Sequence, residues 1–172
     1  TALGRKTDYD KIDDFSAEAQ LEQVEWWQTA LAEMEANFDY DELTPDAQLS
    51  YDMFEYRAER AAASTEFMDQ FYILDQMSGA HTFLPSFLLG QHVVESESDM
   101  EAFVARLSGI GTAMDQLLAR AQNNAEAGTR PPRFAYDAVI AESGKIISGA
   151  PFDDGEPSAL WTGVEGNLAS LV

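Results

Sequence analysis

Apolar residues recur every three or four positions along most of this chain. Such spacing places them along one side of an α-helix, which completes a turn in about 3.6 residues. The first apolar face begins after Ser16, whose hydroxyl group can cap a helix. It consists of Leu21, Val24, Trp27, Leu31, Met34 and Phe38. The spacing therefore predicts a helix that begins beside Ser16.

Four more apolar faces predict four more helices. The second helix begins at the capping pair Thr44 and Pro45 and is expected to be about eight turns long. Its face is Leu49, Met53, Tyr56, Arg60, Ala63, Phe67, Phe71 and Leu74. The third begins at a capping box of Ser98 and Glu101, and its face is Phe103, Leu107, Ile110, Met114, Leu117 and Ala121. The last two faces are Ala135, Ala138, Val139, Glu142 and Ile146, then Trp161, Val164, Leu168 and Leu171.

The stretch from Met77 to Ser98 is apolar but is interrupted by Gly79, Pro85 and Gly90. We expect a buried, irregular connection with short helical turns there, because proline and glycine weaken helices. No run alternates in the way that a β-strand requires. The predicted fold class is therefore all-α, with about five helices in antiparallel hairpins and one irregular apolar connection.

The chain length fits one domain, so residues 1–172 are expected to form a single helical domain. The first residue is threonine, and the last apolar face is still continuing where the sequence stops. We therefore expect this chain to be an excerpt of a longer protein.

The net charge of −21 comes from 31 acidic and 10 basic residues. A chain this acidic repels phosphate backbones and anionic lipid, so nucleic acid is not an expected partner. No apolar run approaches the roughly 18 residues of a membrane-spanning helix. There is no cysteine, which excludes disulfides, thiolate metal sites and a cysteine nucleophile.

Few residues point to chemistry. His81 and His92 are the only histidines, and neither stands in an H-E-x-x-H or Glu-x-x-His motif. We interpret both as hydrogen-bonded structural residues in the apolar connection and expect no metal, cofactor or catalytic residue in this chain. Among the many carboxylates, Asp69 and Asp75 lie nearest an aromatic face, although pairing with an arginine is the simpler interpretation.

A corner is predicted between the third and fourth helices, in the stretch GTRPPRFAYDAVI at residues 128–140. Gly128 can end a helix, and Pro131 and Pro132 prevent its continuation. Arg130 and Arg133 stand at the start of the next helix, where they can contact an anion or line a cleft. The alternative is a salt bridge to one of the many acidic residues.

Trp26 and Trp27 are adjacent on the first helix and form a candidate aromatic binding surface. On an amphipathic helix, however, one ring is more often buried while the other is half-exposed. Both interpretations remain open from the sequence.

Four stretches resemble the amino-terminal part of a bacterial family, domain of unknown function 885. They are TALGRKTDYDKIDDFS, LSYDMFEYRAE, QMSGAHTFLPSFL and AEAGTRPPRFAYDAVI, and the resemblance spans nearly the whole chain. It implies an exported, periplasmic or lipid-anchored, largely helical relative of zinc metallopeptidases. The family's histidine-glutamate metal motif lies further along its members' chains, so no residue here takes its role. Zinc would belong to the full-length parent.

Three functions follow as hypotheses. The first is that this chain walls a substrate cleft in a zinc metallopeptidase-like protein, with the remainder of its own polypeptide and a peptide substrate as partners. The second is a stand-alone helical module that binds a peptide or protein without catalysis, through Trp26, Trp27 and the segment from Phe83 to Leu89. The third is a family member that has lost its chemistry and has a structural role. Enzymatic activity of this chain alone is not predicted, since it holds no complete active site.

Overall fold

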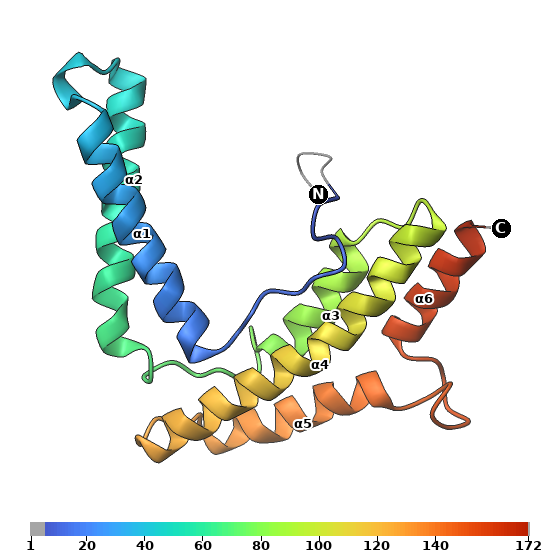
Figure 1. Ribbon diagram of the computed structural model, residues 1–172. Helices are drawn as coiled ribbons and strands as arrows, with labels where there is room; N and C mark the ends of the chain where they lie inside the picture. Colours follow the sequence, from blue (N-terminus) through green and yellow to red (C-terminus); the bar gives the residue numbers. More distant parts are fainter. Residues whose placement is uncertain (1–5, 172) are drawn as a thin grey trace. The chain divides into compact units, whose positions relative to one another are not determined.

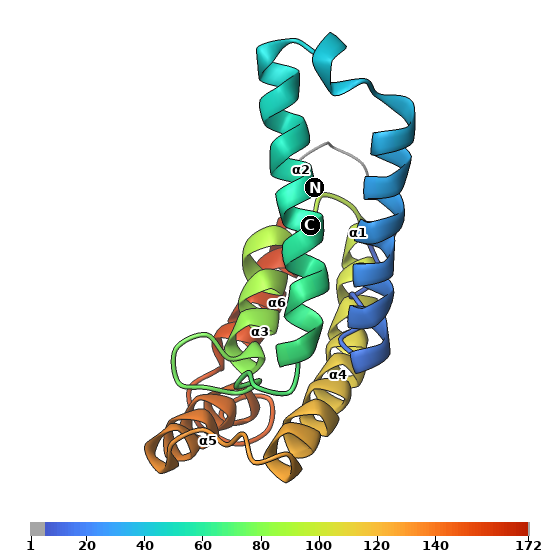
Figure 2. The same cartoon turned by 90° about the vertical axis from the view of Figure 1, so that its left-hand side faces the viewer.

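The computed structural model describes residues 6–171, and in that range it contains six α-helices and no strand (Figures 1 and 2). The helices are α1 (Ala17–Asn37), α2 (Pro45–Ser64), α3 (Ala80–Gln91), α4 (Glu97–Glu126), α5 (Arg133–Ile147) and α6 (Ala159–Ser170). Two short 3-10 helices, Tyr40–Glu42 and Thr65–Phe67, accompany them. The predicted all-α fold class is confirmed, with one helix more than expected.

The chain divides into two compact units. One is the continuous stretch Phe15–Phe71, which we call the inserted hairpin because it interrupts the other unit in the sequence. The second, the main unit, comprises the described residues of Thr1–Asp14 and Tyr72–Val172. The single domain over residues 1–172 stays a prediction.

The inserted hairpin consists of α1 and α2, which run antiparallel and side by side (Figures 1 and 2). Both predicted caps are confirmed. The Ser16 hydroxyl accepts a hydrogen bond from the Ala19 amide at 3.1 Å, and the Thr44 hydroxyl accepts one from the Ala47 amide at 3.4 Å. These bonds satisfy amides that have no partner within the first turn of a helix.

Helix α2 departs from the prediction in two ways. It ends at Ser64 instead of near Leu74. The hydroxyl groups of Ser64 and Thr65 donate to carbonyl oxygens of the last turn at 2.7 Å, and such bonds compete with continuation of the helix. The predicted core face is also exposed, with Leu49, Met53 and Tyr56 at 60%, 52% and 57%.

The core of the main unit lies where α3 packs against α4, α5 and α6. Its buried side chains are Leu84 and Leu88 of α3, Phe103, Ala113 and Leu117 of α4, and Ala135 of α5. The prediction of an irregular connection is therefore wrong over Ala80–Gln91, which forms a regular helix with Pro85 inside it. Burial of Leu84 and Leu88 stabilises the helix by about 2 kcal/mol each, enough to offset one lost backbone hydrogen bond.

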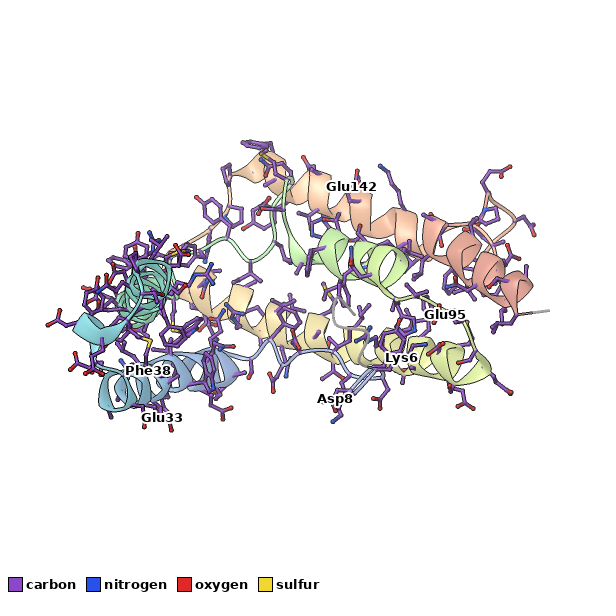
Figure 3. The ribbon with its side chains drawn as sticks, turned by 90° about the horizontal axis from the view of Figure 1, so that it is seen from above. Lys6, Asp8, Glu33, Phe38, Glu95 and Glu142 are labelled. Carbon is purple, nitrogen blue, oxygen red and sulfur yellow. The ribbon has the colours of Figure 1, made fainter. Side chains whose placement is uncertain are left out.

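The amino end of α4 is capped two residues earlier than predicted. The Ser96 hydroxyl accepts from the Asp99 amide and donates to the Asp99 carboxylate, so the capping pair is Ser96 and Asp99 instead of Ser98 and Glu101. Lys6 fixes this arrangement, because its ammonium group lies 2.8 Å from both carboxylate oxygens of Asp99. Lys6 also reaches Glu95, as Figure 3 shows. Hydrogen bonds from Lys6, Ser96 and the Glu95 amide lower the pKa of Asp99 to about 2.

The amino-terminal segment of the main unit packs over the loop between α3 and α4. The Tyr9 ring is buried and stacks on the His92 ring at a centroid distance of 4.2 Å. The Tyr9 hydroxyl donates to the Val93 carbonyl at 2.8 Å and accepts from the Val93 amide at 2.7 Å. Arg106 of α4 adds a hydrogen bond to the Lys11 carbonyl at 3.0 Å. The segment around Tyr9 is thereby part of this core.

The predicted corner after α4 is confirmed. Gly128 has a φ of 99°, a left-handed conformation that side chains disfavour, and α4 ends two residues before it. Pro131 and Pro132 follow, and α5 begins at Arg133. Helix α6 begins after Ser158, whose hydroxyl accepts from the Trp161 amide at 3.2 Å.

Candidate functional site

Two hollows of the main unit meet at the amino end of α6. The first has a volume of about 460 Å³ and is lined by residues from α4, α5, α6 and the loop before α6. These residues are Met100, Phe103, Val104, Leu107, Ile146, Ile147, Pro151, Phe152, Ser158, Leu160, Trp161 and Val164. All but Ser158 are apolar, so this apolar hollow is suited to a hydrocarbon or aromatic group.

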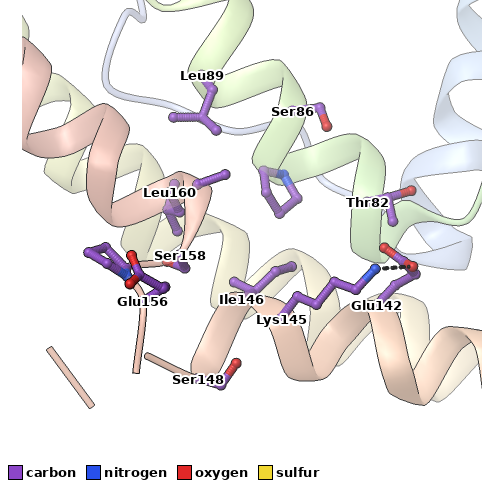
Figure 4. Close-up of a pocket in the computed structure, with 13 residues that line it drawn as sticks. Thr82, Ser86, Leu89, Glu142, Lys145, Ile146, Ser148, Glu156, Ser158 and Leu160 are labelled. Carbon is purple, nitrogen blue, oxygen red and sulfur yellow. Dashed lines mark hydrogen bonds and ion pairs between the residues drawn. The ribbon is translucent and has the colours of Figure 1, made fainter. Parts of the chain in front are cut away.

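The second hollow, which we call the polar hollow because charged side chains line it, has a volume of about 490 Å³ (Figure 4). It lies between α3, α5 and the segment that enters α6, and it shares Ile146, Ser158 and Leu160 with the apolar hollow. Its charged side chains are Glu142, Lys145 and Glu156. An apolar hollow and a hollow that also holds charged side chains therefore adjoin across the first turn of α6.

The loop between α5 and α6 shapes both hollows. Gly149 has a φ of 80°, and a Cβ atom there would overlap the Glu156 carbonyl oxygen. The backbone at Gly149, near the start of the loop, therefore lies against the backbone at Glu156, near its end. The Gly155 amide donates to the Asp153 carboxylate at 2.7 Å. Hydrogen bonds from the Gly155 and Gly149 amides lower the pKa of Asp153 and keep its carboxylate charged. The loop thereby holds Phe152 at the rim of the apolar hollow.

The charges of the polar hollow are already partly paired. The Lys145 ammonium group lies 2.7 Å from the Glu142 carboxylate one turn away on α5. Both side chains are accessible, so the pair contributes little to folding stability. Glu156 leaves the hollow with an excess of negative charge. A ligand that spans both hollows would therefore combine an apolar group with a polar or cationic one.

Arg130 and Arg133 are both exposed and lie at the corner between α4 and α5. The Arg130 guanidinium donates to the Ala125 carbonyl of α4 at 3.1 Å, which is a contact at a helix end. Neither arginine forms an ion pair with an acidic side chain in the part of the chain that the structure describes. They do not line either hollow. Their contact with an anion or a cleft stays a prediction.

Trp26 and Trp27 adopt the more ordinary of the two predicted arrangements. Trp26 is 54% exposed, whereas Trp27 packs on Phe54 of α2 at a centroid distance of 5.0 Å. The two indole rings meet edge to face at 76°, so they do not form one flat surface. Their use as a binding surface stays a prediction.

The two histidines are equally buried, with 4% of each side chain exposed, but their surroundings differ. His92 donates from Nε2 to the Asp99 carbonyl at 2.8 Å and accepts at Nδ1 from Arg106 at 3.1 Å. Burial lowers the pKa of His92, and the accepted bond requires the neutral ring. The predicted hydrogen-bonded role is therefore correct for His92.

For His81 the predicted hydrogen bonds are wrong. Neither of its ring nitrogens has a hydrogen-bond partner among the described residues. Its ring lies directly over Gly79, where a Cβ atom would meet Nδ1 at 2.5 Å. The glycine admits the imidazole into the core but offers it no polar group. Such an unpaired buried ring is uncommon in folded proteins.

Asp75 caps the turn before α3 instead of pairing with an arginine. Its carboxylate accepts hydrogen bonds from the Met77 and Ser78 amides at 2.6 and 2.8 Å. These bonds lower the pKa of Asp75, which excludes the raised pKa that a general acid needs at neutral pH. Asp69 is exposed, and its role stays a prediction.

Zinc requires several nitrogen, oxygen or sulphur ligands that converge on one point. Within residues 6–171, no three histidine, aspartate or glutamate side chains gather in this way, so these residues do not fit the metal. In the same range, no helix is both long enough and apolar enough to cross a bilayer.

Sequence reasoning missed both hollows. Ile146, Trp161 and Val164 were correctly placed on apolar helix faces, but the same spacing describes a filled core and a hollow equally well. The signal that could have helped is the run APFDDGEP, because its two prolines and its glycine predict a loop with turns between the last two helices.

Comparison with known proteins gives one match. A family model described as a bacterial protein of unknown function, DUF885, covers residues 1–170. No curated protein and no solved structure matches the chain.

Proposed function

Because the chain belongs to DUF885, a family of bacterial proteins of unknown function, we propose that it is the amino-terminal helical part of an exported zinc metallopeptidase-like protein. In this proposal it walls the substrate cleft and binds the peptide, while zinc and the catalytic residues belong to the remainder of the polypeptide. No chemical step is assigned to residues of this chain, since those described do not fit a metal.

The observation that carries the proposal is the apolar hollow beside α6. Its volume of about 460 Å³ is in the range of binding pockets for small molecules and large enough for an aromatic or branched side chain. Four of its lining residues, Val104, Leu107, Ile147 and Phe152, remain exposed at the rim. Filling the hollow would remove apolar surface from water, which favours binding by about 25 cal/mol per Å².

The adjoining polar hollow supplies a second contact. A peptide whose apolar side chain enters the first hollow places its backbone or the next side chain at the second. There the Lys145 ammonium group and the segment around Ser158 can contact carbonyl oxygens of the peptide backbone. The carboxylates of Glu142 and Glu156 favour a cationic side chain on the peptide. The arrangement thus favours peptides in which an apolar residue adjoins a polar or basic one.

The test uses matched arginine substitutions on α5. Ile147 lines the hollow and is 68% exposed, whereas Ile140 is 69% exposed and lies outside both hollows. In the zinc-loaded full-length protein, Ile147→Arg is expected to raise the KM for peptides with a phenylalanine or leucine and to leave kcat almost unchanged. The reason is that the hollow binds the peptide equally well in the ground state and in the transition state, and the arginine blocks this binding. Ile140→Arg is expected to leave both constants unchanged.

The 172-residue chain provides a separate measurement. Titration calorimetry with acetyl-Leu-Phe-Leu-amide should detect binding that Ile147→Arg abolishes and Ile140→Arg preserves, while acetyl-Ser-Gly-Ser-amide should not bind. Elemental analysis after dialysis against Zn²⁺ should find no stoichiometric zinc in this chain. Binding of the peptide without any zinc-dependent hydrolysis by the full-length protein would contradict the peptidase assignment and favour a peptide-binding module.

Export is tested by fractionating cells that express the full gene. The proposal expects the protein in the periplasmic or membrane-anchored fraction. Its recovery with a cytoplasmic marker enzyme would contradict that part of the proposal.

A further inference from the structure

Helix α2 is apolar on two opposite sides. One side packs on α1 through Phe54 and the buried Ala58. About 180° around the helix lie Leu49, Met53 and Tyr56, spaced four and three residues apart. We call these three residues the α2 stripe, and each is more than half exposed. A helix with apolar residues on two sides normally has both sides covered.

The border of the stripe is charged. Asp52, Glu55 and Glu59 follow one another at intervals of three and four residues and form an acidic row along one side of the stripe. The other side carries Asp46 and Arg57, whose charges offset each other. The stripe is therefore bordered by negative charge along one edge only.

The carboxyl end of the stripe is closed by Arg60. Its guanidinium group lies over the Tyr56 ring at 5.8 Å and donates to the Tyr56 hydroxyl at 3.2 Å. This contact ties the Tyr56 hydroxyl to Arg60, while Leu49 and Met53 form the rest of the exposed stripe. A ligand would meet an apolar centre, one acidic edge and a single cation at the end.

From this surface we infer that the α2 stripe is a docking site for a cationic amphipathic helix of a partner protein, with an apolar stripe flanked by lysine or arginine residues. The apolar residues of the partner would cover Leu49, Met53 and Tyr56, and its cations would pair with Asp52, Glu55 and Glu59. Helices that pair in this way combine an apolar seam with charged edges that select the partner.

Charge also excludes two other occupants. The inserted hairpin holds 14 acidic residues and only two arginines, which gives it a formal charge of −12. A second copy of the hairpin would bring a second acidic row against the first, and like charges at such an interface are unfavourable. Anionic lipid would be repelled for the same reason.

The test measures binding of three labelled synthetic peptides of about three heptads to the 172-residue chain by fluorescence anisotropy. The first has leucines at helical spacing flanked by lysines, the second has glutamate in place of lysine, and the third has serine in place of leucine. At about 0.15 M ionic strength, where distant charges are screened, the first peptide should bind at least about tenfold more tightly than either control.

Variants locate the site. Met53→Ser combined with Tyr56→Ser should weaken the lysine peptide at least about tenfold. The matched control, Phe134→Ser with Ile140→Ser, changes two exposed apolar residues of α5 and should leave binding unchanged. Glu55→Lys with Glu59→Lys should reverse the preference and favour the glutamate peptide, which also tests the site in a variant that keeps the apolar stripe.

Three results would overturn the inference. The first is equal binding of the lysine and glutamate peptides, and the second is an equal loss of binding in the α5 control. The third is a dimer of the chain in sedimentation that the Met53 and Tyr56 substitutions convert to monomer, because the stripe would then belong to a second copy.

Discussion

The two buried histidines should respond in opposite directions to the same substitution. His81 and His92 are equally buried, but only His92 has hydrogen-bond partners for both ring nitrogens. Methionine is close to histidine in size and adapts to irregular space, so it removes the polar atoms with little change in volume. We therefore compare His81→Met with His92→Met.

A buried polar group without a partner costs about 1–3 kcal/mol. His81→Met removes this cost, and we expect a gain of about 1–2 kcal/mol after small losses in packing. For a chain of this size that raises Tm by about 3–6 °C. His92→Met instead removes the hydrogen bonds that His92 forms with the Asp99 carbonyl and with Arg106, and it removes the stacking on Tyr9. We expect a loss of about 2–4 kcal/mol from that change.

The assay is urea unfolding followed by circular dichroism at pH 7.5, together with calorimetric melting of the same samples. At that pH the wild-type His92 ring is neutral because burial lowers its pKa, so His92→Met removes hydrogen bonds and not a charge. The reasoning would be refuted if His81→Met lost more than about 1 kcal/mol, because the His81 ring would then be contributing a stabilising polar contact.

Three further predictions concern single sites in the main unit. The pKa of Asp99 is lowered, so its contribution to stability should be complete above pH 3.8 and lost as the pH falls towards 2; Asp99→Asn should flatten this part of a stability-versus-pH curve. Gly149→Ala should cost about 1–3 kcal/mol and weaken binding in the apolar hollow, because its left-handed conformation has no room for a Cβ atom. Replacing Arg130 and Arg133 by glutamine should lower Tm slightly and leave ligand binding by the full-length protein unchanged; a selective loss of affinity at unchanged Tm would show that they contact the ligand.

The helix ends could be predicted where a single residue decides the local hydrogen bonding. Ser16, Thr44 and Gly128 act within one turn of the backbone, so their effect can be read without knowledge of the rest of the fold. The start of α4 could not be placed in this way, because Ser96 and Ser98 are equally good capping residues. The choice depends on Lys6, which lies 93 positions away from Asp99 in the sequence.

What covers an apolar face could not be predicted at all. The spacing of Leu49, Met53 and Tyr56 identifies one side of a helix, but it contains no information about the element that packs there. Helix α3 was missed for a related reason, since local rules count Pro85 against a helix and burial is a property of the whole fold. The two hollows of the candidate site depend on the placement of four helices and a loop, so they lie beyond such rules altogether.

The order of the two units along the chain has a consequence for biosynthesis. Tyr9 leaves the ribosome early, but Val93, to which it bonds, is made 84 residues later. The ribosome adds about 5–20 residues per second. The inserted hairpin is therefore complete and can fold before the residues that Tyr9 contacts have been made. Any nascent chain that stops before Val93 leaves Tyr9 exposed to other molecules, so a chaperone that protects this protein should be needed first at the segment around Tyr9.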